Sequence, residues 1–330
     1  MKRAWALGCD MGGTNIRCAA VSLDGDVLMM RRGPSLASRG AEEVAENIAR
    51  QVNALLADAR ARRLGAPRAI GVAVPGPLNV FTGTVMVAPH VAAWHSFPLR
   101  VRLEEKIGRS VIVENDANAW AYGEFWRGSA RGCRDVVLLT LGTGVGGGLI
   151  VGGRLVHGRS GMAAELGHVT VEPGGMPCDC GSHGCLEAYA STSGLRGLVE
   201  RRLGVKRGAA LKSEMLDKDG DFSVRAMTAL ARRHNRLALE TFGLAGRYLG
   251  VAIASFLNVF NPELVVVGGG MAGALPYMRK TMMAEVRERA FSAIAREARI
   301  VRAALGPQGG VVGAAYVALN PPSKPLQSGR

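Results

Sequence analysis

The sequence contains no Gly-Lys-Ser or Gly-Lys-Thr triplet, which excludes a Walker A phosphate loop. It also contains no Cys-x-x-Cys pair, so a thioredoxin-like redox centre has no support. Aromatic residues make up only 5% of the 330 residues, whereas glycine occurs 45 times, so many tight turns are expected instead of a bulky aromatic core. With 48% hydrophobic residues at this length, the chain can form two globular domains with cores of their own.

Neither a membrane span nor a secretory leader is expected. The longest uncharged run, Val136 to Gly153, contains seven glycines and has β-branched residues on both sides, which is typical of two strands and a turn. The apolar run that follows Met-Lys-Arg ends at Asp10, too soon for the hydrophobic region of a signal peptide. Cysteines that stay reduced fit the cytoplasm, which is the expected location.

Basic residues exceed acidic ones by 41 to 27, which gives a net charge of +14. Such an excess is compatible with a nucleic-acid-binding surface. The arginines are scattered in ones and twos, however, with no long basic block and no interleaved aromatic residues. Solvated helix faces explain the same charge and are the favoured interpretation, so no nucleic-acid partner is expected.

One stretch, Glu165 to Glu187, concentrates three of the six cysteines together with His168. The pattern is H-x9-C-x-C-x4-C, formed by His168, Cys178, Cys180 and Cys185. Three thiolates and an imidazole complete the donor set of a structural zinc ion. The alternative is a set of buried thiols that act as small hydrophobic residues. It fits poorly because Pro, Asp, Ser and His surround these cysteines, so we expect zinc within loop 168–185.

Two glycine-rich turns each follow an apolar strand and each lead into a hairpin. The first is Asp10 to Thr14, and the second is Gly142 to Gly148. Backbone N–H groups of such turns approach an anion closely because no Cβ intervenes. For the first turn alone, a turn without a ligand is an equally good interpretation. The second contains GxGxxG, but a hairpin follows it instead of the helix that a dinucleotide-binding fold requires. We interpret the two turns as equivalent parts of a duplicated domain.

Strands and helices alternate along the chain, which favours a mostly parallel α/β sheet. Apolar periodicity predicts helices over 42–64, 99–107, 186–203, 224–261, 276–295 and 309–316, and buried strands over 69–74, 110–113 and 264–267. The expected domains are 1–117 with the C-terminal helix (about 310–330), and 118–309. The last helix is expected to pack back on the first domain, and the tail after Pro321 is expected to be disordered.

A cluster of hydrogen-bonding side chains follows the strand over 110–113. Asp116 lies there between Asn115 and Asn118. The carboxyl ends of strands are where open α/β sheets bind ligands. A lone aspartate at this place would be a helix cap, but the two asparagines exceed what a cap requires.

Seven segments in this order carry a resemblance to a known family. They are DMGGT, PGP, ENDAN, LGTGVGGG, ELGH, CDCGSHGCLE and NPELVVVGGG. In this combination the chain resembles the ROK family (repressor, open reading frame, kinase) over about residues 5–320, and within it the bacterial ATP-dependent glucokinases. The resemblance implies an actin-like, ribonuclease H-like α/β fold, duplicated over two domains, with the zinc loop in the second.

The resemblance also implies roles for individual residues. Asp116 would be the general base on the 6-hydroxyl of a hexose. The sugar would be bound by Gly76, Asn115, Asp116, Glu165, His168 and Glu187. The phosphates of ATP and a Mg²⁺ ion would be held by Asp10, Gly12, Gly13, Thr14, Gly142, Thr143 and Gly144, with Gly268, Gly269 and Gly270 beside the adenosine. His168 would direct one ring nitrogen to zinc and the other to the sugar, so the zinc would do no chemistry.

Two departures from the family pattern bear on the choice of hexose. Ala164 replaces the glycine that usually precedes ELGH in glucokinases, and an alanine there also occurs in N-acetylmannosamine kinases. His90 stands where glucokinases often have asparagine. Glucose is the expected substrate, and N-acetylmannosamine or N-acetylglucosamine is the alternative. A sugar-responsive regulator of this family would carry an N-terminal helix-turn-helix domain, whereas nine residues precede Asp10, which favours an enzyme. The family suggests a homodimer or a homotetramer.

Overall fold

The computed structural model describes residues 4–87 and 94–322. The chain divides into two compact units. The first contains residues 1–133, 148–164 and 304–330, and the second contains 134–147 and 165–303. The domain boundary expected at residue 117 stays a prediction. His90 and tail residues 323–330 lie outside the described residues.

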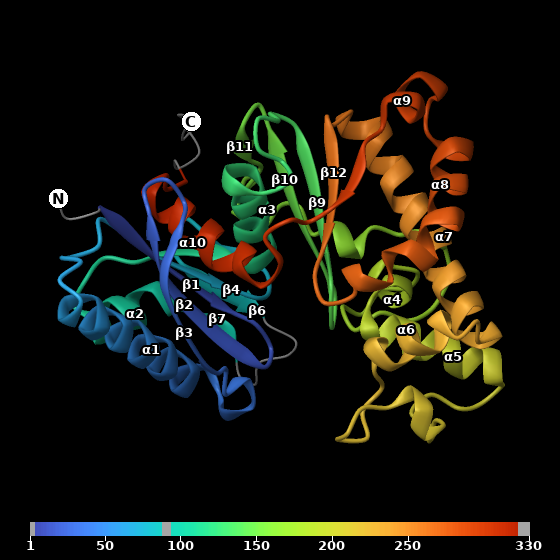
Figure 1. The fold of residues 1–330 in the computed structure, drawn as a ribbon, viewed down its shortest axis with the longest axis horizontal. Helices are drawn as coiled ribbons and strands as arrows, with labels where there is room; N and C mark the ends of the chain where they lie inside the picture. Colours follow the sequence, from blue (N-terminus) through green and yellow to red (C-terminus); the bar gives the residue numbers. More distant parts are fainter. Residues whose placement is uncertain (1–3, 88–93, 323–330) are drawn as a thin grey trace. The chain divides into compact units, whose positions relative to one another are not determined.

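The first unit is built on a five-stranded sheet with the order β3-β2-β1-β4-β8 (Figure 1). Its strands are β1 (Trp5–Met11), β2 (Asn15–Ser22), β3 (Val27–Pro34), β4 (Ile70–Val74) and β8 (Ile112–Asn115). Strands β1, β2 and β3 are antiparallel neighbours, whereas β1, β4 and β8 run parallel. A small sheet of β5 (Leu78–Asn79), β6 (Thr84–Val87) and β7 (His95–Phe97) accompanies it.

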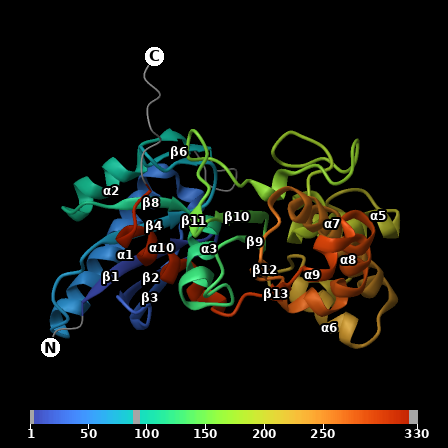
Figure 2. The same cartoon turned by 90° about the horizontal axis from the view of Figure 1, so that it is seen from above.

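Different helices cover the two faces of this sheet. They are α1 (Ala41–Ala61) and α2 (Leu99–Ile107) on one face, and α10 (Gly309–Leu319) with α3 (Asp116–Arg127) on the other. Side chains alternate along β1, so Leu7, Cys9 and Met11 join the core beneath α1, while Ala6 packs with Val311 of α10. Figure 2 shows α3 and α10 lying together. The C-terminal helix therefore belongs to the fold of the first unit.

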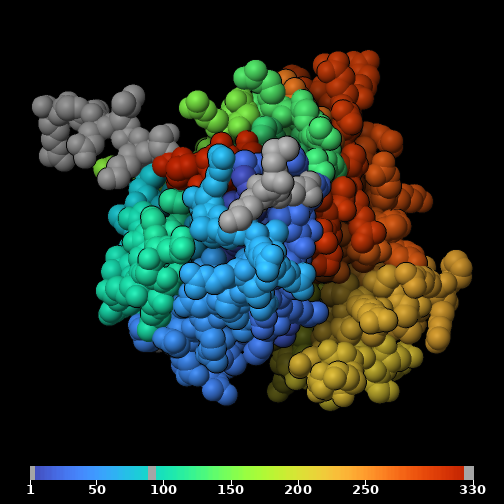
Figure 3. Space-filling view, turned by 60° about the vertical axis from the view of Figure 1, so that its left-hand side comes forward, coloured from blue at the N-terminus to red at the C-terminus, as the bar shows by residue number. Residues whose placement is uncertain are grey.

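Helix α10 approaches its neighbours so closely that the contact points are glycines. A Cβ on Gly8 would lie 1.9 Å from the carbonyl oxygen of Val311, and one on Gly71 would lie 2.0 Å from that of Ala314. A Cβ on Gly313 would lie 1.6 Å from the carbonyl oxygen of Ala119 in α3. In the space-filling view the C-terminal segment, in red, lies against the N-terminal part, in blue (Figure 3).

The second sheet has the order β11-β10-β9-β12-β13. Its strands are β9 (Val136–Leu141), β10 (Val145–Val151), β11 (Arg154–Leu155), β12 (Leu264–Gly268) and β13 (Ile300–Arg302). Strand β12 runs parallel to β9 and to β13, and β10 is antiparallel to β11. In both sheets the first strand is central, with its hairpin on one side and two later strands on the other. The predicted duplication is confirmed by this topology.

The second unit contains the larger share of the helices. They are α4 (Glu187–Ala190), α5 (Thr192–Leu203), α6 (Val224–Arg232), α7 (Arg236–Phe260), α8 (Leu275–Arg289) and α9 (Ser292–Glu297). Short 3-10 helices complete the described chain: η1 (Ala37–Arg39), η2 (Leu166–His168), η3 (Ser213–Met215), η4 (Ala272–Ala274) and η5 (Gly306–Gln308). Helices α7 and α8 lie side by side in both views (Figures 1 and 2).

Helix α7 is long and apolar enough to cross a membrane by length and composition, but 56% of its most apolar stretch is buried within the protein. Packing against α8 explains its composition.

Three helices predicted as continuous are interrupted, and that part of the prediction is wrong. The helix over 276–295 breaks at Ala290 and Phe291, between α8 and α9. The other two breaks carry local caps. The helix over 186–203 breaks at Ser191, whose extended backbone lets its hydroxyl accept a hydrogen bond from the N–H of Gly194 at 2.9 Å. The helix over 224–261 breaks before α7, where His234 has a left-handed backbone and Asn235 accepts from the N–H of Ala238 at 3.1 Å. In both of these cases a local cap replaced the next helical turn.

We predict that Gly313→Ala destabilises the protein, although alanine is the better helix former. A Cβ there would enter the backbone of α3, and overpacking costs about 1–3 kcal/mol, more than the ~1 kcal/mol gained in helix propensity. The control is Gly273→Ala, where an added Cβ meets nothing within 4 Å. Urea unfolding compares the two, and a Gly313→Ala variant as stable as the wild type would contradict the close packing.

Candidate active site

The polar cluster predicted after β8 is well ordered. The side-chain oxygen of Asn115 accepts from the N–H of Ala117 at 2.9 Å and from that of Asn118 at 3.1 Å, so Asn115 caps α3. Its amide nitrogen donates to the carbonyl oxygen of Gly76 at 3.2 Å. Because Asn115 serves as the cap and ties the cluster to the Gly76 turn, Asp116 is not needed for that role.

Asp10 lies near the end of β1 and is buried, with 4% of its surface exposed. Its carboxylate lies 3.7 Å from a guanidinium nitrogen of Arg17 and accepts a hydrogen bond from the indole of Trp120. A Cβ on Gly310, at the start of α10, would lie 2.4 Å from the carboxyl carbon. The C-terminal helix therefore begins directly against this acid. No local pattern identifies Trp120 as a partner of Asp10, whereas Arg17 could have been found as a charged residue within an apolar strand.

Both acids titrate far above their ordinary range. Burial, with a smaller contribution from the nearby Asp116, raises the pKa of Asp10 to about 7, although Arg17 and Trp120 oppose the rise. Burial raises the pKa of Asp116 to about 6, and the hydrogen bond from the N–H of Ala117 opposes the rise. Part of this residue reaches solvent. Neighbouring carboxyl groups shifted towards neutrality are typical of sites that move protons or bind cations.

The turn between β1 and β2 is closed by backbone and hydroxyl groups. The N–H of Gly12 donates to the carbonyl oxygen of Asn15 at 2.9 Å, and the Ser35 hydroxyl donates to that of Gly13 at 2.6 Å. The N–H of Ser35 donates to the carbonyl oxygen of Thr14 at 3.0 Å. An added Cβ on Gly13 meets nothing within 4 Å, so the turn leaves space at its tip.

The equivalent turn of the second unit rests on α5. The N–H of Gly142 donates to the carbonyl oxygen of Gly144 at 2.9 Å, and both the N–H and the hydroxyl of Thr192 donate to that of Gly142, at 2.8 and 3.0 Å. The carbonyl oxygen of Thr143 accepts from the Ser193 hydroxyl at 3.5 Å. Sequence reasoning missed Thr192 and Ser193, which lie 50 residues further along the chain.

The third glycine turn lies beside this second one. Strand β12 ends at Gly268, and an added Cβ on Gly269 would lie 2.3 Å from the carbonyl oxygen of Leu141, directly before Gly142. Gly269 has a φ of +87°, which favours glycine. Around Gly270 an added Cβ meets nothing within 4 Å. The carboxyl ends of β9 and β12 therefore present two adjacent glycine turns with open space at one of them.

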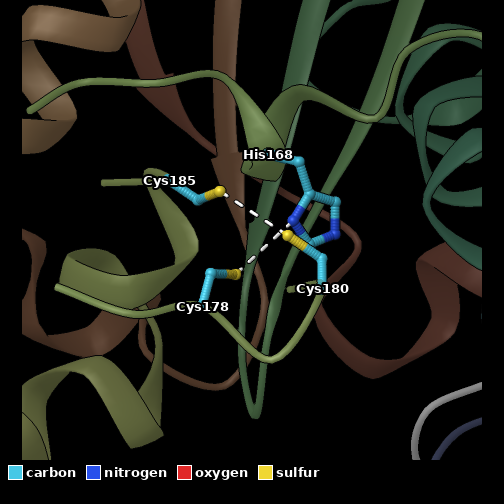
Figure 4. Close-up of side chains that lie close together, drawn as sticks. All are labelled: His168, Cys178, Cys180 and Cys185. Atoms are coloured by element: carbon cyan, nitrogen blue, oxygen red, sulfur yellow. Dashed lines mark hydrogen bonds between the residues drawn. The ribbon is translucent and has the colours of Figure 1, made fainter. Parts of the chain in front are cut away.

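The predicted metal ligands converge in the second unit (Figure 4). The donor atoms of His168, Cys178, Cys180 and Cys185 all lie within 4.8 Å of one another. The Cys180 and Cys185 sulfurs are 3.7 Å apart, and the His168 Nδ1 is 3.7 Å from the Cys178 sulfur. A tetrahedral ion with 2.3 Å bonds to sulfur places two sulfurs about 3.8 Å apart, so the cluster has the size of a metal site. The second nitrogen of His168 points away from the sulfurs.

Glu187 joins this cluster to the Gly142 turn. One carboxylate oxygen accepts from the N–H of Val145 at 2.8 Å, and the other lies 3.8 Å from the Cys178 sulfur. Burial raises the pKa of the Cys178 thiol above its usual range, so an ion that binds here displaces a proton. Glu165 precedes η2, which ends at His168.

Ala164 has a φ of +68°, a left-handed backbone that is unusual for a residue other than glycine. A glycine at this position would adopt the same conformation without strain. The departure noted in the sequence is therefore a matter of local backbone strain next to Glu165.

Each unit by itself brings its share of the predicted site together. The first holds Asp10, Gly12, Gly13, Thr14, Gly76, Asn115 and Asp116, and the second holds Gly142, Thr143, Gly144, Glu165, His168, Glu187, Gly268, Gly269 and Gly270. The single pocket expected from both sets stays a prediction.

Comparison with known proteins identifies the family. Residues 6–320 match the ROK family. The chain belongs to this family. It is 35% identical over 321 residues to the glucokinase of Halalkalibacterium halodurans, with 96% of each chain covered. A ROK family glucokinase from Streptomyces griseus, solved in complex with glucose and AMPPNP, matches with a TM-score of 0.80 at 32% identity, over 96% of this chain and 100% of that one.

A repressor of the ROK family matches over a smaller part. The Escherichia coli transcriptional repressor Mlc is 30% identical over 248 residues, which cover 75% of this chain and 61% of the repressor. The predicted ROK fold, an actin-like α/β architecture in duplicate with a Cys/His loop in the second unit, is confirmed by the topology and the structural match.

We predict that Asp10→Asn changes the pH dependence of stability. The native state holds this proton up to about pH 7, whereas the unfolded chain releases it near 3.8, so wild-type stability is lost as the pH rises through this window. The asparagine variant lacks this loss. Between about pH 5 and about pH 8 its free energy of unfolding therefore rises by on the order of 2 kcal/mol relative to that of the wild type. Chemical unfolding at several pH values measures the gain, and parallel curves for the two proteins would contradict a buried, proton-holding Asp10.

Proposed function

We propose that this ROK protein is a hexose kinase that transfers the γ-phosphoryl group of ATP to the 6-hydroxyl of glucose. The products are ADP and glucose 6-phosphate. The observation that carries the proposal is Asp116, a carboxyl group directly after β8 whose pKa is raised by burial to about 6 and which accepts from the N–H of Ala117 at 2.8 Å, while Asn115 caps α3. The relative and the solved structure named glucokinases, which match over 96% of the chain, support the same activity.

Asp116 acts as the general base in this proposal. With a pKa of about 6 its carboxyl group is ionised at neutral pH and still accepts a proton readily. It takes the proton of the 6-hydroxyl as the hydroxyl oxygen attacks the terminal phosphorus. Beside it, the amide of Asn115 donates to the carbonyl oxygen of Gly76. We propose that these two residues bind sugar hydroxyls together with Glu165, His168 and Glu187.

The residues present fit a nucleotide and a divalent cation. Asp10 holds a proton to about pH 7, and a cation beside it would replace that proton and satisfy the buried charge. Backbone groups of Gly12 to Thr14 and of Gly142 to Gly144 would bind the phosphates, and Gly268 to Gly270 would border the adenosine. When bound, Mg²⁺ neutralises charge on the transferred phosphoryl group.

We propose that zinc occupies the cluster of three cysteines and one histidine. All four donors are used in holding it, so its part is structural. The metal would fix the loop that carries His168, and the second ring nitrogen of His168 would then be directed at the sugar. Glu187 is held by the same loop.

Glucose is the proposed hexose, and an N-acetylhexosamine is the second candidate. The observation behind the second candidate is Ala164, whose left-handed backbone precedes the proposed sugar ligand Glu165. ADP release measured with glucose, N-acetylglucosamine, N-acetylmannosamine, fructose and allose separates the two. The highest kcat/KM on glucose supports the proposal, and the highest value on an N-acetylhexosamine contradicts it. A cytoplasmic location and a homodimer or homotetramer also belong to the proposal.

We predict that Asp116→Asn lowers kcat for glucose phosphorylation by on the order of 10² to 10⁴ with a smaller change in KM. An amide keeps the shape of the carboxyl group but cannot take the proton. Asp219→Asn, in an exposed loop of the second unit, is the control and keeps wild-type kinetics. Turnover of Asp116→Asn close to wild type would exclude the base assignment.

The purified protein should contain about one zinc ion per chain, and Cys180→Ser should lose it together with affinity for the hexose. Elemental analysis and hexose titration provide the two measurements. Cys133→Ser, which lies outside the cluster, is the matched control and retains both. Freshly purified wild-type protein without zinc would rule out the structural metal.

A further inference from the structure

A second cavity lies wholly within the first unit, and none of the residues predicted to bind hexose or nucleotide lines it. Its volume is about 570 Å³, within the range of small-molecule sites. The side chains used in the argument come from β8, α3, β11 and the loop after it, α10 and the loop after β5. They are Phe81, Glu114, Tyr122, Arg154, His157 and Tyr316. We call this cavity the β11 pocket.

Glu114 orients the histidine of the β11 pocket. Only 1% of Glu114 is exposed, and one carboxylate oxygen lies 2.7 Å from the Nε2 of His157. The other accepts from the N–H of Asn115 at 2.9 Å and from the amide of Asn118 at 3.0 Å. Because a carboxylate can only accept, Nε2 carries the hydrogen, which leaves Nδ1 of the neutral ring as an acceptor. In residues 4–87 and 94–322 no partner of Nδ1 is found.

Two further groups bring hydrogen-bond donors to the pocket. The phenol oxygen of Tyr122 accepts from the N–H of Leu155 at 2.9 Å, which leaves its own hydrogen for another acceptor. Burial raises the pKa of Tyr122, and Tyr316 and Glu114 add to the rise, whereas the N–H of Leu155 and the Arg154 guanidinium oppose it. Arg154 lines the same pocket as this phenol. Within the described part of the chain Arg154 has no acidic partner. A cation without a partner beside a phenol donor favours an anionic ligand.

Aromatic rings form the apolar part of the wall. The rings of Tyr122 and Tyr316 meet edge to face with centroids 4.9 Å apart, and Phe81 meets His157 in the same way at 6.2 Å. The pocket therefore offers ring surface next to one cation, one donor and one acceptor, with the buried carboxylate of Glu114 engaged by His157, Asn115 and Asn118. Its volume exceeds what a bare inorganic anion fills.

We propose that the β11 pocket binds a sugar phosphate. The Arg154 guanidinium pairs with the phosphoryl oxygens, the Tyr122 hydroxyl donates to the same group, and Nδ1 of His157 accepts from a sugar hydroxyl. The faces of Phe81 and Tyr316 cover the carbon skeleton. A neutral sugar would lack the charge for Arg154, and inorganic phosphate would lack the hydroxyl and the skeleton.

A ligand in this pocket would affect catalysis because Glu114 connects the pocket to the residues beside Asp116. This consequence rests on the proposed function. Glu114 directly precedes Asn115 and accepts from its N–H, while its other oxygen holds His157. A ligand that donates a hydrogen bond to Nδ1 of His157 therefore changes the hydrogen bonding of Glu114 and of Asn115, which is next to Asp116. We expect a sugar phosphate in the pocket to lower kcat in a way that excess hexose does not reverse.

The test is calorimetric titration of fructose 6-phosphate into the full chain, with saturating glucose and no nucleotide. Wild type should show one saturable site per chain, and Arg154→Gln should weaken binding by about tenfold or more. Arg159→Gln is the matched control, because it removes a nearby exposed arginine that does not line the pocket. Absence of saturable binding to wild type, or equal weakening in both variants, would overturn the proposal, as would inorganic phosphate binding as tightly as the sugar phosphate.

Initial rates test the link to catalysis separately. Fructose 6-phosphate should lower kcat of wild type and of Arg159→Gln, and should leave kcat of Arg154→Gln unchanged. Binding without any effect on rate would contradict the link through Glu114. Because the titration needs no turnover, a failure of the proposed kinase activity would be distinguished from a failure of the site.

Discussion

Two carboxyl groups that share one buried region of the first unit are the constraint on which the rest of that unit depends. Asp10 lies near the end of one strand and Asp116 follows another. Burial raises the pKa of both carboxyl groups, and Asp116 adds to the rise at Asp10. Buried acids without compensation destabilise a fold. Arg17, Trp120 and the capped start of α3 supply part of the compensation, and a bound cation would supply the remainder.

The arrangement of α10 follows from this constraint. The helix begins at Gly309 and Gly310, where a Cβ on Gly310 would collide with Asp10 and one on Gly309 would lie 3.1 Å from the ring of Trp120. Its later turns lie directly on β1, β4 and α3, where Gly8, Gly71 and Gly313 remove the Cβ atoms that would collide. Close packing of this kind excludes water from one side of the acids. It thereby keeps their pKa values high.

Much of the fold could be predicted from the sequence because its signals are local. Apolar runs marked the buried strands β4 and β12, and the cysteine spacing marked the metal cluster. The breaks at Ser191 and His234 were missed, since apolar periodicity continues across both. Glu114 and His157 were missed for another reason. Their contact joins residues 43 positions apart, and no local pattern reports such a pair.

The central claim is that a carboxyl group with a raised pKa takes the proton in phosphoryl transfer. The most direct measurement is the pH dependence of kcat/KM for glucose at saturating ATP and Mg²⁺. The account predicts that kcat/KM falls with decreasing pH from about pH 6, the pKa that burial gives Asp116. A kcat/KM that stays constant down to the ordinary value of 3.8 would contradict it.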